Sequence, residues 1–96
     1  MSQARILVVE DDGGLREALV DTLLLGGYEC READSGERAL VQLSRQSFDM
    51  VISDIQMGGM DGLTLLQTIR QQYPQTPVLL MTAYANIDGA VRAMRE

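Results

Sequence analysis

The chain has 96 residues with 8 basic and 14 acidic side chains, a net charge of −6. This length fits one small domain, and the acidic balance argues against binding of nucleic acid or an anionic membrane by this segment alone. Every basic residue is arginine, so histidine and lysine chemistry is excluded, and Cys30 as the only cysteine excludes an internal disulfide and fits a cytoplasmic location.

The N-terminal segment predicts a buried strand and then a helix. Residues 5–9 form a continuous apolar and β-branched run. The helix is predicted from the residues that would form its inner face, which follow at helical spacing: Leu15, Ala18, Leu19, Thr22 and Leu23. Asp12 is a candidate N-cap for this helix, and Gly26 with Gly27 predicts its end.

The second strand and helix are more polar. Residues 28–32 alternate in polarity, which is typical of an edge strand. Asp34 and Glu37 have the spacing of a capping box at the start of a helix. The apolar face of that helix is predicted to consist of Ala39, Leu40 and Leu43.

Two further strand–helix units complete the chain. Residues 49–54 and 77–82 predict buried strands, and the glycines of residues 56–62 predict a loop after the first of them. The third helix is predicted from Leu63, Leu66 and Ile69, and it ends before Pro74. The fourth helix is predicted from Ile87, Ala90, Val91 and Met94.

This alternation predicts an α/β fold with a parallel sheet and right-handed crossovers. With the polar second strand at an edge, we expect a flavodoxin-like doubly wound sheet of order 2-1-3-4. Ligands bind such sheets at the carboxyl ends of the strands where the order switches, here between strands 1 and 3. Glu10, Asp11 and Asp12 follow strand 1, Asp54 ends strand 3, and Thr82 ends strand 4.

The acids at these strand ends suit a divalent cation. Clustered carboxylates disfavour one another's ionisation, and an all-oxygen cluster suits Mg²⁺. Aspartate is also a covalent nucleophile, which makes Asp54 a candidate phosphoryl acceptor. Two plainer interpretations stay open: residues 10–12 as a polar loop, and Asp12 as a helix cap only.

Five segments of the sequence together resemble a known family. They are residues 6–12, 34–40, 49–54, 60–62 and 81–83. With them the chain resembles, over its whole length, the receiver domain of bacterial two-component response regulators. Residues 82–94 look most like regulators of the nitrogen-regulator class, in which the receiver precedes an ATPase that activates sigma-54 transcription.

The resemblance implies a role for each matching residue. Asp54 would be the phosphoacceptor and a metal ligand, Asp11 would bind Mg²⁺ directly, and Glu10 would bind it through water. The backbone carbonyl of Gln56 would be another ligand, and Asp12 is the least supported one. The phosphoryl-binding and switch residues would be Thr82, Ala83 and Tyr84.

The sequence departs from the family at two places. The usual Met-Pro after the acceptor is Met57-Gly58 here, which predicts a more mobile loop. The family also has a fifth strand, ending in a lysine, and a fifth helix, which this sequence does not reach. We therefore expect residues 1–96 to form a single receiver domain that is incomplete at its C-terminus.

The resemblance implies a phosphorylatable switch that catalyses its own phosphorylation and dephosphorylation. Its partners would be a sensor histidine kinase, its own output domain with ATPase and DNA-binding parts, and, in a homodimer, a second copy of the chain. The competing interpretation is a non-phosphorylated interaction or dimerisation module of the same fold. A phosphohydrolase is disfavoured, since that class needs an acid where Gln56 stands.

Overall fold

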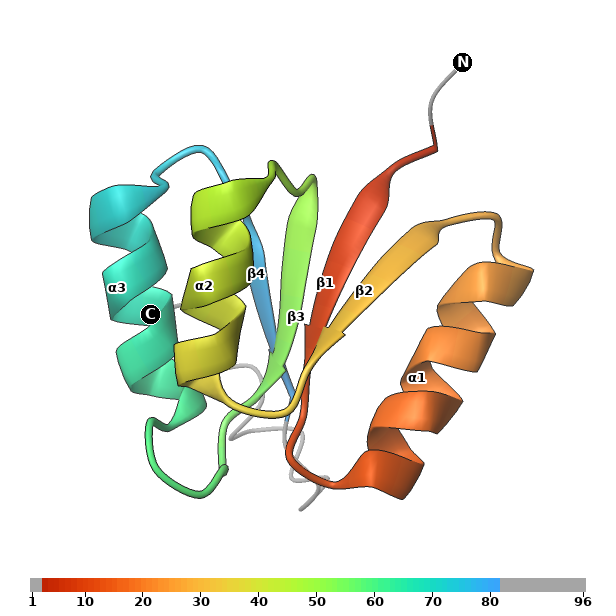
Figure 1. The fold of residues 1–96 in the computed structure, drawn as a ribbon, viewed down its shortest axis with the longest axis horizontal. Helices are drawn as coiled ribbons and strands as arrows, with labels where there is room; N and C mark the ends of the chain where they lie inside the picture. Colours follow the sequence, from red (N-terminus) through yellow and green to blue (C-terminus); the bar gives the residue numbers. More distant parts are fainter. Residues whose placement is uncertain (1–2, 82–96) are drawn as a thin grey trace.

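The computed structural model describes residues 3–81 as a parallel sheet with helices on both sides (Figure 1). The strands pair in the order β2-β1-β3-β4, which confirms the predicted flavodoxin-like topology. The elements are β1 (Arg5–Val9), α1 (Gly13–Leu25), β2 (Glu29–Ala33), α2 (Gly36–Arg45), β3 (Met50–Asp54), α3 (Gly62–Gln72) and β4 (Val78–Met81).

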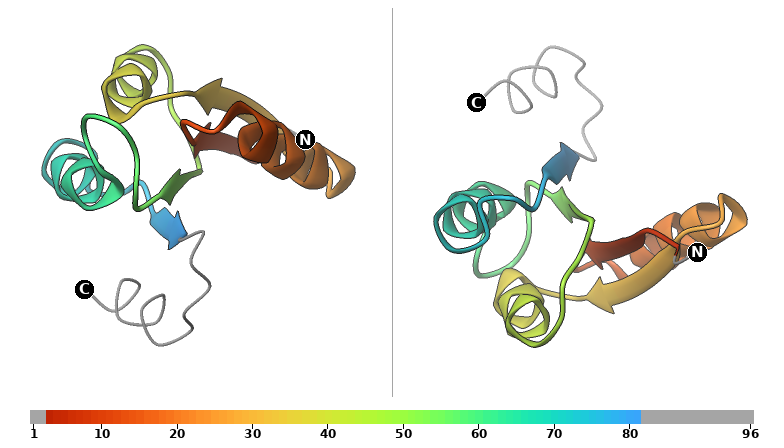
Figure 2. Two further views of the ribbon diagram at one scale, coloured as in Figure 1. Left: turned by 90° about the horizontal axis from the view of Figure 1, so that it is seen from below. Right: turned by 90° about the horizontal axis from the view of Figure 1, so that it is seen from above.

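Two helices, α2 and α3, cover one face of the sheet (Figures 1 and 2). Their apolar side chains meet those of β1 and β3, and several of the residues involved have no exposed surface. The buried cluster consists of Leu7, Val9, Ala33, Ala39, Leu43, Phe48, Val51, Leu65 and Ile69. Because alternate strand residues point to one face, burial of this cluster fixes the register in which the strands pair.

The opposite face carries α1 (Figure 2). Ile6, Val8 and Ile52 form a smaller buried cluster there, with Leu19 and Leu23 of the helix packed against it. No residue of α1, all of which the structure describes, is itself buried. Leu15, predicted on the apolar face, is 39% exposed, so the helix contacts the sheet mainly through its middle turns.

Several details of the predicted elements were wrong. Ser35 rather than Asp34 caps α2, because its side chain accepts a hydrogen bond from the Arg38 N–H. The apolar face of α3 is centred on Leu65, which is fully buried, while Leu63 is 40% exposed. Strands β2, β3 and β4 each begin one residue later than predicted. Strand β4, predicted to be buried, is only partly buried. The predicted fourth helix lies outside the described residues.

Candidate functional site

The carboxyl ends of β1 and β3 lie side by side at one edge of the sheet, the lower edge in Figure 1. The two strands pair in register from Ile6 with Met50 to Val9 with Ser53. Glu10 and Asp11 therefore follow β1 opposite Asp54, the last residue of β3. One carboxylate oxygen from each of these three residues lies within 4.8 Å of the other two, as the sequence predicted.

Glu10 is the most deeply placed of the three acids. Only 1% of its surface is exposed, and its Oε2 accepts a hydrogen bond from the Asp12 N–H at 3.1 Å. Its Oε1 is buried without a hydrogen-bond partner among the described residues. Burial, together with hydrogen bonding and charge from neighbouring acids, raises the pKa of Glu10 to about 7.

Asp11 differs from Glu10 in both exposure and charge. Its side chain is exposed, and its Oδ2 accepts a hydrogen bond from the Gly58 N–H at 3.0 Å. This bond and the neighbouring Glu10 carboxyl lower the pKa of Asp11 from its ordinary value. At neutral pH, Asp11 therefore presents a full negative charge beside a carboxyl group that is still partly protonated.

Asp54 is held where strand β3 turns into the following loop. Its side chain is 6% exposed, and its Oδ1 accepts a hydrogen bond from the Gln56 N–H at 3.2 Å. Gly62 lies against the Asp54 backbone, where a β-carbon would overlap the Asp54 carbonyl oxygen. Glycine at this position therefore allows helix α3 to start directly behind the candidate acceptor.

Of the other predicted site residues, the structure describes Asp12 and Gln56 but not residues 82–84. Asp12 accepts a hydrogen bond from the Leu15 N–H at 3.1 Å, so its carboxylate serves as the N-cap of α1. A role for Asp12 or for the Gln56 carbonyl as a metal ligand stays a prediction. Thr82, Ala83 and Tyr84 lie outside the described residues.

Two groups near the site were not identified from the sequence. Arg16 donates from Nη1 to the Glu10 carbonyl oxygen at 2.7 Å and from Nε to Glu32 Oε1 at 3.1 Å. The second group is the Gly58 N–H on Asp11. The sequence offered one indication of this hydrogen bond: position 58 is glycine, which has an N–H, where the family usually has proline, which has none.

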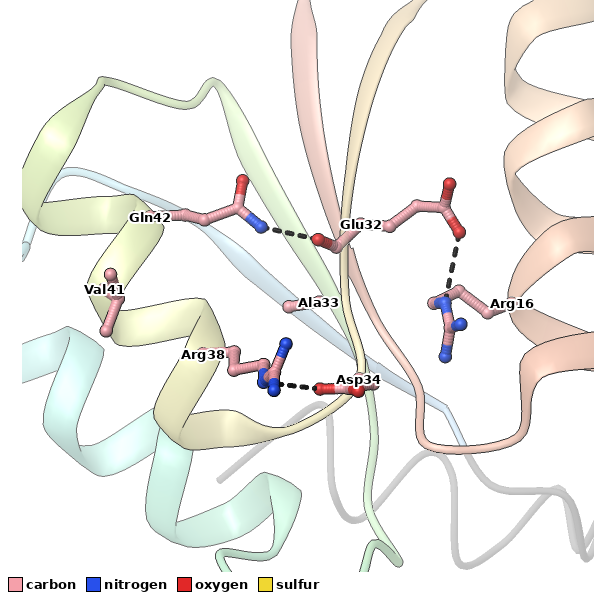
Figure 3. Close-up of a pocket in the computed structure, with 7 residues that line it drawn as sticks. All are labelled: Arg16, Glu32, Ala33, Asp34, Arg38, Val41 and Gln42. Atoms are coloured by element: carbon pink, nitrogen blue, oxygen red, sulfur yellow. Dashed lines mark hydrogen bonds and ion pairs between the residues drawn. The ribbon is translucent and has the colours of Figure 1, made fainter.

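A hollow of about 520 Å³ opens at the end of β2, beside the site (Figure 3). Its charged side chains are paired with one another: Arg16 faces Glu32, and Arg38 Nε lies 3.3 Å from Asp34 Oδ1. These opposite charges compensate each other. The acids at the ends of β1 and β3 instead face one another, so they are the stronger candidates for binding a ligand.

The acidic cluster fits a hard divalent cation. All of its side-chain donors are carboxylate oxygens, the ligands that Mg²⁺ prefers. The orphaned Glu10 Oε1 needs a partner, which a cation or a water bound to a cation would supply. Such an ion would also favour the ionised form of Glu10, because opposite charge lowers the pKa of a carboxyl group.

The chain matches the response regulator receiver domain model over residues 6–96. It belongs to this family. The response regulator FleR of Pseudomonas aeruginosa is 60% identical over 97% of the chain, and NtrC of Salmonella typhimurium is 38% identical over all of it. These relatives confirm the nitrogen-regulator class that the sequence predicted. The chain spans about a fifth of the length of both regulators.

Solved receiver structures have the same fold. TrrA from Thermotoga maritima, crystallised in complex with Mg²⁺-BeF, has a TM-score of 0.84 and 38% identity. The match covers 95% of this chain and 81% of the TrrA chain. None of the helices that the structure describes is long and apolar enough to cross a membrane.

Proposed function

We propose that this receiver is a phosphorylatable signalling switch, with Asp54 as the acceptor and Mg²⁺ as the cofactor. The observation that carries the proposal is the convergence of Glu10, Asp11 and Asp54 within 4.8 Å at the switch point of the sheet. Membership of the receiver family and the likeness to a protein crystallised with Mg²⁺-BeF support it.

In this mechanism an Asp54 carboxylate oxygen attacks the phosphorus of a donor, and the leaving group departs on the opposite side. The product is an acyl phosphate on Asp54, which water later hydrolyses. Bound Mg²⁺ would neutralise the charge that the phosphoryl oxygens bring to the cluster. Asp11 and Glu10 would hold the ion, and the Gln56 N–H would keep Asp54 oriented through its bond to Oδ1.

The proposed partners follow from the family. The proposed donor is a phosphohistidine on a sensor kinase, as expected for a receiver domain of a response regulator. The receiver would regulate an output domain that activates sigma-54 transcription, as expected for the nitrogen-regulator class. Thr82, Ala83 and Tyr84 would transmit the change, and the setting would be the cytoplasm.

The test is the intact mass of the protein after incubation with a small phosphodonor and Mg²⁺. We expect one phosphoryl group on the wild type, one on Asp34→Asn and none on Asp54→Asn. Asp34 is the matched control, because it also follows a strand at this edge but pairs with Arg38. An unmodified wild type would leave two causes, a non-phosphorylated interaction module or a site that needs the lysine of the family's fifth strand. The same test on a longer chain that includes that strand would separate them.

A further inference from the structure

The loop after β3 is tied to the loop after β1 through its backbone. The Gly58 N–H donates to Asp11 Oδ2 at 3.0 Å, across 47 residues of sequence. We infer that this N–H positions the Asp11 carboxylate for the cation, so that Gly58 is a positioning residue of the metal site. The inference rests on the proposed function, because it concerns the same site.

Asp11 gains from the Gly58 N–H in this chain because of where its side chain lies. Its side chain is exposed, and it stands beside the carboxyl groups of Glu10 and Asp54. Repulsion from these groups favours rotation of the side chain toward solvent. A bond from a fixed amide opposes that rotation by holding one of the two carboxylate oxygens, Oδ2. A ligand held in place before binding loses less conformational freedom when the ion arrives.

The loop that carries Gly58 is itself anchored on its other side. Met57 and Met60 pack against the larger core cluster. Met60 also lies over Gly36 at the start of α2, where a β-carbon would come within 2.8 Å of the Met60 sulfur. The N–H of Gly58 is therefore presented from a segment that is packed on the core.

The feature of residue 58 that matters is its N–H, not its missing side chain. Its φ is not in the left-handed region, and a β-carbon there would lie 3.9 Å from Asp11 Oδ2, an ordinary contact. Alanine should therefore fit and keep the bond. Proline is the one residue that lacks the N–H, so proline and alanine form a matched pair of variants.

The experiment measures Mg²⁺ dissociation constants by titration calorimetry for the wild type, Gly58→Ala and Gly58→Pro. We expect Gly58→Ala to stay within about twofold of the wild type and Gly58→Pro to bind about tenfold more weakly, as for a lost hydrogen bond to a charged group. Equal affinities for the two variants would overturn the inference alone. Tighter binding by Gly58→Pro would also overturn it, by showing that the amide competes with the ion.

A second measurement without metal covers the case in which Gly58→Pro does not fold. The Gly58 amide proton resonance is compared between the wild type and Asp11→Ala, with the Gly59 amide as the internal reference. We expect an upfield shift at Gly58 when its acceptor is removed, and an unchanged resonance would overturn the inference. A wild type that binds no Mg²⁺ would overturn the proposed function and this inference together.

Discussion

Two groups of acids at the same edge of the sheet are in opposite surroundings. At the end of β2, Glu32 and Asp34 are paired with Arg16 and Arg38. At the ends of β1 and β3, three carboxylates face one another, and the buried Glu10 Oε1 has no partner among the described residues. An acid at a strand end is thus not a site by itself, and the charge around it decides whether it recruits a cation.

The largest expected difference between the two groups is in their response to Mg²⁺. At a concentration of 1,000 times its dissociation constant, Mg²⁺ should add about 4 kcal/mol to the free energy of unfolding. Urea unfolding of the wild type and Asp54→Asn, with and without the ion, measures this gain. The variant should lose most of it, and an equal gain in both proteins would show that the ion binds elsewhere.

Glu10, at the carboxyl end of β1, should also determine how the stability of the metal-free protein depends on pH. The folded pKa of Glu10, about 7, lies above its ordinary 4.5, so the folded state holds a proton that the unfolded state releases. The free energy of unfolding should therefore fall by up to about 3 kcal/mol as the pH rises from 4.5 to 8. The pKa values of Asp11 and Asp61 are lowered from 3.8, so the stabilisation from these two groups is lost only at lower pH. It stays nearly constant between pH 4.5 and 8.

Urea unfolding at a series of pH values in the presence of a chelator tests this expectation. Glu10→Gln is the control, because an amide does not titrate and the fall should be absent. A wild-type profile that stays flat between pH 4.5 and 8 would contradict the raised pKa. Saturating Mg²⁺ should also flatten the wild-type profile, since the ion favours ionised Glu10 at every pH in the range.

A smaller effect separates the two interpretations of Asp12. Because its carboxylate caps α1, Asp12→Ala should lower the free energy of unfolding by about 1 kcal/mol with the metal chelated, and Asp12→Asn by only a few tenths. Chemical denaturation of both variants measures the difference. A more than tenfold loss of Mg²⁺ affinity in Asp12→Asn would instead indicate that Asp12 is a ligand.

The smallest effect is expected at the paired end of β2. Arg38 is 75% exposed in its pair with Asp34, and exposed ion pairs contribute little. Arg38→Gln should change the free energy of unfolding by less than about 0.5 kcal/mol and leave Mg²⁺ affinity unchanged. Parallel unfolding and calorimetry check both points. A loss of Mg²⁺ affinity would show that the two groups of acids are coupled.

Much of the fold and the centre of the site could be predicted because they depend on periodicity and chain order. Apolar runs at the right spacing indicated the strands, and the parallel pairing of β1 with β3 brought Glu10, Asp11 and Asp54 to one edge. The choice between neighbouring candidates could not be predicted in the same way. Asp34 and Ser35 are both good capping residues, and only the packed helix shows that Ser35 accepts the bond.

The sequence by itself determined the order of the elements, the carboxyl ends of β1 and β3 and the carboxylates that meet there. These properties follow from local patterns and from the geometry of parallel sheets, which every chain of this type obeys. Tertiary structure alone decided that Glu10 is buried with an orphaned oxygen and that Gly58 donates to Asp11. Both depend on how two distant loops pack against each other, which no pattern within either loop records.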